Sequence, residues 1–320
     1  MKRKWLKMHD LNKVTKKVQE VFEDVPVFAV GGCVRDYLLK RKPKDFDYCI
    51  NLDPDEIETA IKKAGRRAYC TGKKFGTIGC KINIGDTWHF VEVTTWRKEQ
   101  YLPGSRKPQV EFVNDLKVDL SRRDYTLNAI AMDANGSLFD PFGGRLDIMA
   151  KKIKAVGVAK DRLKEDPLRM LRAARFAAQL GFEVDPNLIG VMRQMAPSIL
   201  TVSRERWVQE MDKLLVSNNV GSGIDVLVNT SLLRYMIPEL WLIATEYKYI
   251  FEEMIIDIQH QDDLDLKWAY LLEPIGKPYA ETKVVGLDRI IHKNSNLISH
   301  EMAIGITRRL KFSNERTKKT

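Results

Sequence analysis

Asp45 and Asp47, in the segment DFDYCI, are the side chains whose type and spacing best suit chemistry. Residues two apart on a strand project to the same face, so the two carboxylates would lie side by side while Phe46 points into the core. Such a pair can bridge two divalent cations roughly 3.5 to 4 Å apart, which activate an attacking hydroxyl and stabilise a leaving phosphate oxygen. Hard oxygen ligands favour Mg²⁺. A bare Asp-x-Asp is more commonly the solvated face of an edge strand, so the surrounding sequence must decide.

A glycine turn lies upstream of this pair. VFAV at 27–30 is typical of a strand, Gly31 and Gly32 follow, and the segment from Val34 to about Arg41 is helical in pattern. Two glycines at a helix N-terminus let backbone N–H groups approach a triphosphate, and Arg35 would add charge-assisted contacts. Gly-Gly alone is also an ordinary strand-to-helix turn.

The whole run VGGCVRDYLLKRKPKDFDYCI resembles the head motif of the DNA polymerase β superfamily, in the form used by class II CCA-adding enzymes and bacterial poly(A) polymerases. The resemblance implies a metal site at Asp45 and Asp47, completed by a third acidic residue from a neighbouring strand. Glu92, in HFVEVTTW, is the candidate for this third catalytic carboxylate, although it could equally be a surface residue.

A basic segment, LSRRDYTLNAIAMD at 120–133, resembles the RRDFTxNA motif of the same family. The resemblance implies that Arg123 contacts the nucleotide and that Asp124 and Asn128 shape the ribose pocket. The alternative is a capped helix with an Arg–Asp surface pair. DPFGGRLD, at 140–147, resembles the connector between the head and a helical body.

The segment EDPLRMLRAARFAAQLGF, at 165–182, can be analysed from its periodicity. At about 100° per residue, Glu165, Arg169, Arg172 and Phe176 fall on one narrow face, and Asp166 lies beside Arg169. Cytosine and adenine present an amino donor next to a ring-nitrogen acceptor, whereas uracil and guanine present a carbonyl next to a ring N–H. A carboxylate beside a guanidinium therefore matches the first pattern and opposes the second.

The same segment is similar to the family's nucleotide-selecting helix. The resemblance implies that Asp166 and Arg169 pair with the incoming base and that Arg172 and Arg175 contribute to the nucleotide pocket. The alternative is structural: Pro167 suits a first helical position, so Asp166 could be only an N-cap. Downstream, SRERWVQEMDKLL at 203–215 is similar to SxERIxxELxKLL and is expected to brace this helix.

The predicted fold class is α+β: a polymerase β-like nucleotidyltransferase head with a mixed sheet, followed by an all-helical body. We expect a head at 1–150, a helical nucleotide-selecting and RNA-binding part at 151–240, and a degenerate HD-like helical region at 241–320. The predicted elements are an exposed amphipathic N-terminal helix, a helix at 55–64, strands at 76–84 and 87–95, a mobile loop at 96–109, and helices at 167–180, 203–216 and 224–236.

LKWAYLLEPIGKP, at 266–278, resembles the LLHDIGKP element of HD phosphohydrolases, but Glu273 and Pro274 replace the metal-binding His-Asp pair. We therefore expect no phosphohydrolase activity. The four cysteines lack CxxC spacing and are expected to be reduced core thiols rather than a zinc site.

Composition sets outer limits on the function. The 320 residues are 44% hydrophobic and 30% charged, and they contain neither a secretory signal nor an apolar run long enough to span a membrane. The net charge of +10 favours an anionic partner, of which RNA is the simplest.

The resemblance implies a cytoplasmic, Mg²⁺-dependent enzyme, monomer or homodimer, that adds CMP and AMP from CTP and ATP to the tRNA 3′ end at the acceptor stem. The closest alternatives are a poly(A) polymerase and a partial enzyme that adds only CC or only A. A small-molecule nucleotidyltransferase shares the head but would not need the 165–175 helix, and an inactive RNA-binding module would not need both Asp45 and Asp47.

Overall fold

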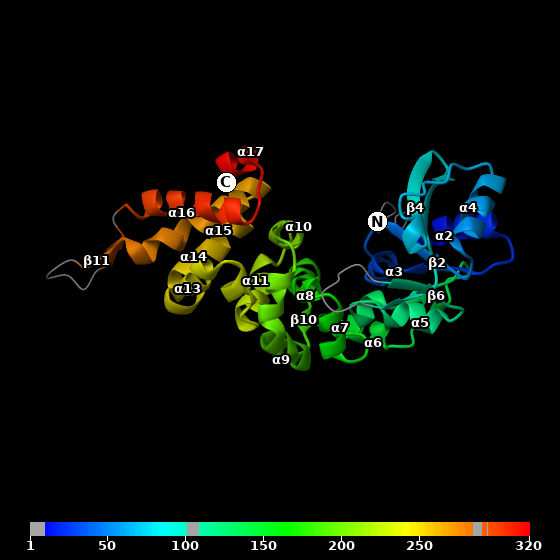
Figure 1. The fold of residues 1–320 in the computed structure, drawn as a ribbon, viewed down its shortest axis with the longest axis horizontal. Helices are drawn as coiled ribbons and strands as arrows, with labels where there is room; N and C mark the ends of the chain where they lie inside the picture. The colour runs from blue at the N-terminus through cyan, green and yellow to red at the C-terminus, as the bar shows by residue number, and fades with distance from the viewer. Residues whose placement is uncertain (1–9, 101–108, 284–289, 293) are drawn as a thin grey trace, which may run out of the picture. The chain divides into compact units, whose positions relative to one another are not determined.

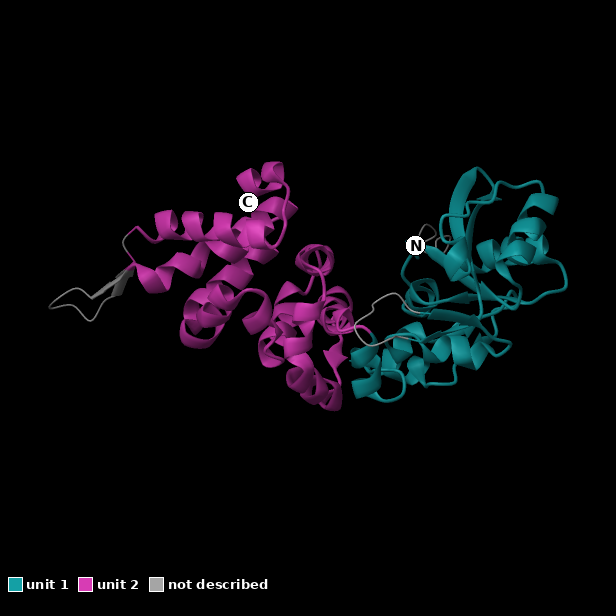
Figure 2. Ribbon diagram, viewed as in Figure 1, with its two compact units in different colours: residues 1–165 teal, residues 166–320 magenta. Residues whose placement is uncertain are grey.

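The computed structural model describes residues 10–100, 109–283, 290–292 and 294–320, which form two compact units, Met1–Glu165 and Asp166–Thr320 (Figure 2). Residues 151–165 thus belong to the first unit, although the sequence pattern placed the end of the head near residue 150. Val156 explains this difference, because it is buried in one core cluster with Val30 and Cys49 of the head. The predicted boundary near residue 240 stays a prediction.

The first unit is built on a six-stranded sheet in the order β3-β4-β2-β1-β7-β8. Its strands are β1 (Val27–Val30), β2 (Phe46–Ile50), β3 (Thr77–Ile84), β4 (Thr87–Thr95), β7 (Ala131–Met132) and β8 (Leu138–Phe139). β2 and β4 run parallel, and the other neighbours are antiparallel. The predicted mixed sheet is therefore confirmed. A further short strand, β9 (Lys152–Ile153), follows later in the unit.

Helices and 3-10 turns connect and cover these strands. They are α2 (Asp10–Phe22), α3 (Gly32–Leu38), α4 (Pro54–Lys63), η1 (Lys73–Phe75), α5 (Leu116–Ser121), η2 (Thr126–Asn128), α6 (Gly144–Met149) and α7 (Ala159–Glu165). α2 and α4 lie side by side and both contact β3 (Figure 1). The N-terminal helix is amphipathic as predicted, because Leu11, Val14 and Val18 are buried on one face of α2 and its lysines are exposed on the other; residues 1–9 of the predicted helix lie outside the described residues.

The predicted mobile loop at 96–109 has ordered flanks. Arg97–Gln100 (β5) and Gln109–Phe112 (β6) form an antiparallel pair with Arg97 opposite Phe112. The prediction was wrong for these flanks, because polar and basic strands can pair through their backbones without an apolar pattern. Residues 101–108 lie outside the described residues.

The second unit is mainly helical (Figure 1). Its helices are α8 (Leu168–Leu180), α9 (Pro186–Met195), η3 (Ala196–Thr201), α10 (Arg204–Leu215), α11 (Val220–Asn229), α12 (Leu232–Met236), α13 (Pro238–Glu246), α14 (Lys248–Gln259), α15 (Leu264–Leu272), η4 (Glu273–Tyr279), α16 (Ser295–Arg309) and α17 (Asn314–Lys319). Its short strands are β10 (Glu183–Val184), β11 (Glu281–Lys283) and β12 (Ile290–His292), so the all-helical prediction holds only approximately.

The helix predicted at 224–236 is two helices, α11 and α12. Ser231, between them, has φ of 59°, a left-handed backbone that interrupts a helix. The Thr230 hydroxyl donates to the carbonyl oxygen of Val226 at 2.6 Å and closes the end of α11. Apolar spacing continues across the break, so periodicity alone could not reveal it.

Gly144 permits a close approach between α6 and η2. A Cβ at this position would lie 2.1 Å from the carbonyl oxygen of Thr126, far inside contact distance. We expect Gly144→Ala to destabilise the first unit by about 3 kcal/mol or more, measured as a shift in its denaturant midpoint. Gly190→Ala, in the open interior of α9 of the second unit, is the control: it should leave the midpoint of the first unit unchanged and stabilise the second unit by about 0.5 to 1 kcal/mol. Equal midpoints for the two variants would contradict this packing.

Candidate active site

Three acidic residues line one hollow of the first unit. Asp47 on β2 is half-buried and pairs in register with Glu92 on the parallel strand β4, while Asp45 is exposed immediately before β2. The hollow has a volume of about 410 Å³, and its lining is Lys44, Asp45, Phe46, Asp47, Trp88, His89, Phe90 and Glu92. The register thus places Glu92 where a third carboxylate was expected from a neighbouring strand.

Asp47 carries the clearest electrostatic signature of this hollow. Its pKa is raised from 3.8 to about 6: burial is the largest cause, the charges of Glu92 and Asp45 add to the rise, and the guanidinium of Arg123 opposes it. The excess negative charge and the hard oxygen donors fit a divalent cation. No three acidic, histidine or cysteine side chains among the described residues form a ready-made metal cluster. Mg²⁺ usually takes only one or two carboxylates and completes its coordination with water or phosphate oxygens.

The glycine turn lies against the same carboxylate. Gly31 has φ of 74° and comes directly before α3. A Cβ at Gly31 would lie 3.1 Å from Arg123 Nη1 and 3.9 Å from Asp47 Oδ2. Only glycine adopts this backbone readily, and its bare backbone leaves space beside a cation and a carboxylate. The structure therefore brings Gly31, Arg123 and Asp47 together from three separate parts of the sequence.

Arg35 belongs to a chain of hydrogen bonds beside the turn. Its Nη1 donates to Asn128 Oδ1 at 3.0 Å, and Asn128 Nδ2 donates to Asp124 Oδ1 at 3.0 Å. Arg35 also donates through Nε and Nη2 to Asp36 Oδ1 at 2.9 and 2.8 Å. Asp124 and Asn128 are buried. These hydrogen bonds therefore fix the positions of Asp124 and Asn128, the two residues predicted to shape the ribose pocket.

Asp119 was missed by sequence reasoning. It is fully buried and accepts hydrogen bonds from Arg122 Nε and Nη2 at 3.0 and 2.8 Å and from Arg123 Nη2 at 3.4 Å. Burial acts to raise the pKa of Asp119, but the charges of Arg122 and Arg123 outweigh it and the pKa is lowered. Asp119 thus orients Arg123. The feature of the sequence that could have revealed this role is that Asp119 lies three residues before Arg122 and four before Arg123.

In the second unit, Asp166 lies two residues before Leu168, the first residue of α8, with Pro167 between them. Its Oδ1 accepts from the backbone N–H of Leu168 at 3.1 Å, and its Oδ2 accepts from Arg206 Nη2 at 2.7 Å. The helix predicted at 167–180 is confirmed to within a residue as α8, while Glu165, placed by the periodicity on the same face as Arg169, ends the separate helix α7. The hydrogen bond from Leu168 to Asp166 agrees with the structural alternative, in which Asp166 only caps the helix. Arg206 was not among the predicted site residues.

The arginines of α8 differ in their surroundings. Arg169 is buried, and the half-buried Arg172 lies 5.5 Å from the centre of the Phe176 ring. Arg175 Nε donates to Glu210 Oε2 of α10 at 2.6 Å, and its guanidinium lies 4.1 Å from the Phe176 ring. Arg175 therefore ties α8 to α10, and its role in nucleotide binding stays a prediction.

α10 braces the start and the middle of α8. Arg206 holds Asp166 at the start of α8, and Glu210 holds Arg175 further along it. Trp207, between them, is buried in the core. The bracing expected from SRERWVQEMDKLL is therefore present in the geometry.

Two family models match this chain. The first, described as the poly A polymerase head domain, matches residues 27–154, and the second, described as "Probable RNA and SrmB- binding site of polymerase A", matches residues 181–243. The chain is 33% identical over 296 residues to the CCA-adding enzyme of Staphylococcus epidermidis, covering 86% of this chain and 71% of that relative. The chain belongs to the CCA-adding enzyme family.

Other members of the CCA-adding enzyme family are also similar to this chain. The CCA-adding enzyme of Lactiplantibacillus plantarum is 37% identical over 245 residues, which cover 76% of this chain and 57% of the relative. The crystal structure of the Bacillus stearothermophilus CCA-adding enzyme in complex with CTP superposes with a TM-score of 0.70 and 28% identity, covering 99% of this chain and 68% of that one. The chain spans only 50 to 57% of several curated family members.

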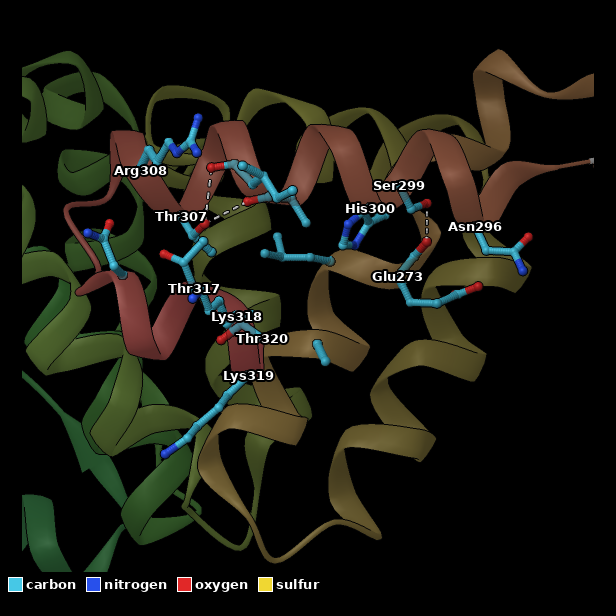
Figure 3. Close-up of a pocket in the computed structure, with 15 residues that line it drawn as sticks. Glu273, Asn296, Ser299, His300, Thr307, Arg308, Thr317, Lys318, Lys319 and Thr320 are labelled. Carbon is cyan, nitrogen blue, oxygen red and sulfur yellow. Dashed lines mark hydrogen bonds between the residues drawn. The ribbon is translucent and has the colours of Figure 1, made fainter.

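This member of the CCA-adding enzyme family also has a pocket of about 750 Å³ in its second unit, between α15, η4, α16 and α17 (Figure 3). Glu273, where the resemblance to HD phosphohydrolases led us to expect a histidine, lines this pocket together with His300. The hydroxyl of Ser299 donates to the carbonyl oxygen of Glu273 at 2.5 Å. The absence of phosphohydrolase activity stays a prediction.

None of the helices within the described ranges is both long and apolar enough to cross a membrane.

Proposed function

We propose that this chain is an RNA nucleotidyltransferase that adds CMP and AMP to the 3′ end of tRNA. The observation that carries the proposal is the hollow where Asp45, Asp47 and Glu92 meet, with Arg123 and Gly31 against Asp47. In the reaction, the RNA 3′-hydroxyl attacks the α-phosphate of CTP or ATP. A new bond forms from this oxygen to the α-phosphorus, the bond to the β-phosphate oxygen breaks, and pyrophosphate leaves.

Mg²⁺ is the cofactor that suits this hollow, with Asp45 and Asp47 as its ligands and Glu92 as the third carboxylate. When bound, Mg²⁺ would supply neutralisation of phosphate charge and a lowered pKa for the attacking hydroxyl. The raised pKa of Asp47 supports the assignment, because it reports a buried carboxylate whose charge is not fully compensated.

The nucleotide would be held by the elements around the glycine turn. Bare backbone at Gly31 and Gly32 gives the triphosphate a close approach, and Arg123, oriented by Asp119, faces it with positive charge. Arg35 would act on the nucleotide indirectly. Its hydrogen bond to Asn128, and that of Asn128 to Asp124, hold the predicted ribose pocket in place.

Base selection would come from the start of α8. Asp166 supplies acceptor oxygens and Arg169 donors, which match the exocyclic amine and ring nitrogen of cytosine and adenine. Arg206 would hold the carboxylate of Asp166 in place for this contact, and Glu210 would hold α8 through Arg175. Arg172 would complete the nucleotide pocket.

The partners implied are the acceptor end of tRNA, CTP and ATP. A net charge of +10 supports an RNA partner, because it favours association with the phosphate backbone. We place the activity in the cytoplasm. Poly(A) synthesis is the second candidate, because the matching head model is named for a poly A polymerase.

One assay tests the proposed function. Purified protein and Mg²⁺ are incubated with tRNA transcripts that end before CCA, after C and after CC, with each nucleoside triphosphate offered separately. We expect CMP on the first two ends and AMP on the third. Long A tracts would indicate poly(A) synthesis, and addition at only some of the three ends would indicate a CC-adding or A-adding enzyme. No incorporation on any end would contradict the proposal.

A further inference from the structure

Two large aromatic side chains lie exposed on β4, next to the carboxylates. Trp88 is 62% and Phe90 47% exposed, although aromatic residues are usually buried in a sheet. Side chains alternate along a strand, so Trp88, Phe90 and Glu92 share the open face while Val91 and Val93 lie in the core. The two rings therefore form a row that leads to the acidic hollow.

The position of Phe90 is fixed by its neighbours. Its ring lies over Gly79 of β3, where a Cβ would come within 2.5 Å of the ring. The ring also packs edge-to-face on Tyr69, with centroids 5.5 Å apart and an interplanar angle of 68°. Trp88 lies opposite Asn83 in the register and is the more exposed of the two. The sheet thus holds one ring firmly and presents a second beside it.

Positive charge accompanies these rings. Lys81 is exposed on β3 directly opposite Phe90, and Lys44 is exposed at the rim of the hollow. Aromatic rings next to cations are the composition of surfaces that bind single-stranded nucleic acid, where bases stack on the rings and phosphates meet the charges. RNA offers both the flat bases that stack on the rings and the phosphates that meet the lysines, so RNA is the occupant that this composition favours.

We propose that Trp88 and Phe90 form a stacking platform for the terminal bases of the RNA being extended, so that its 3′-hydroxyl reaches the hollow at Asp47. The inference rests on the proposed function. Each addition changes the terminal base, so the protein needs a grip that tolerates different bases. Stacking provides it, because every base has a π-face, whereas hydrogen bonds to base edges would discriminate.

Steady-state kinetics on tRNA ending before CCA test the platform. We expect Trp88→Ala to raise the KM for tRNA about 5- to 150-fold, the range for loss of one base–aromatic stack, with the KM for CTP changed less than about twofold. Trp88→Phe keeps a ring and should recover most of the affinity. Phe139→Ala, which removes a 41% exposed ring from β8 at the opposite edge of the sheet, is the matched control and should match wild type.

A binding measurement separates this inference from the proposed function. A 12-nucleotide single-stranded RNA is titrated without nucleoside triphosphate, and the tryptophan fluorescence of wild type and Trp88→Phe is compared. Quenching that is lost in Trp88→Phe supports stacking, even if wild type transfers no nucleotide. Identical quenching in both proteins, together with a wild-type KM for tRNA in Trp88→Ala, would overturn the platform.

Discussion

Replacing Asp47 by asparagine is expected to lower the rate of nucleotide transfer at least about 1,000-fold, because a carboxylate that holds the catalytic metal is lost. Asp47 is the innermost acidic residue of the hollow, in register with Glu92 and close to Gly31. Asparagine preserves its shape but not its charge. The rate is measured as CMP incorporation on tRNA ending before CCA at saturating CTP.

The fold should survive this substitution. Burial and the nearby charges of Glu92 and Asp45 make the ionised form of Asp47 unfavourable, so a neutral amide removes a destabilising charge. We therefore expect a thermal midpoint for Asp47→Asn no lower than that of wild type. Asp86→Asn, in the exposed turn between β3 and β4, is the matched control and should keep full activity. An Asp47→Asn variant that transfers CMP at the wild-type rate would be incompatible with the metal site.

Replacing Asp166 by alanine is expected to weaken base selection. Asp166 offers acceptors and Arg169 offers donors, and each well-paired contact contributes about 1 to 3 kcal/mol of discrimination between bases. We expect the preference for CTP over UTP, measured as a ratio of kcat/KM values, to fall about 100-fold in either Asp166→Ala or Arg169→Ala. Transfer of CMP should also slow.

Two further variants show whether a change in CTP preference comes from Asp166 itself. Arg206→Gln removes the partner that holds Asp166 Oδ2, so it should lower the CTP preference less than loss of Asp166 itself. Arg234→Ala, exposed on α12, should leave the preference unchanged. A wild-type preference in both Asp166→Ala and Arg169→Ala would show that the base is read elsewhere, and the capping contact with Leu168 would then be the whole role of Asp166.

Local patterns predicted the strands that carry the acidic residues. Apolar runs, the alternation of buried and exposed side chains along β4, and the flanking turn residues located β2, β3 and β4 to within about a residue. Asp45 and Asp47 could be singled out because their spacing fits a strand. The neighbour of β2, and hence the place of Glu92, required the family resemblance, because strand order is set by contacts distant in sequence.

Contacts between distant residues were the part that sequence did not reveal. Arg206 and Glu210 on α10 hold residues of α8 that lie about 35 to 40 positions earlier in the chain. Either residue could have been an ordinary charge on an exposed helix face. The start of α8 was predicted from Pro167, but Glu165, which the periodicity placed on the same face as Arg169, ends the separate helix α7.

The most direct test of the metal-dependent transfer is a single-turnover measurement with the double variant Asp45→Asn, Asp47→Asn. Enzyme in excess over tRNA ending before CCA is mixed with saturating CTP and Mg²⁺, and the rate of the first CMP addition is compared with wild type. We predict a rate below about 0.1% of wild type, because both ligands of the metal are gone. Addition at the wild-type rate would contradict a reaction centred on these two carboxylates.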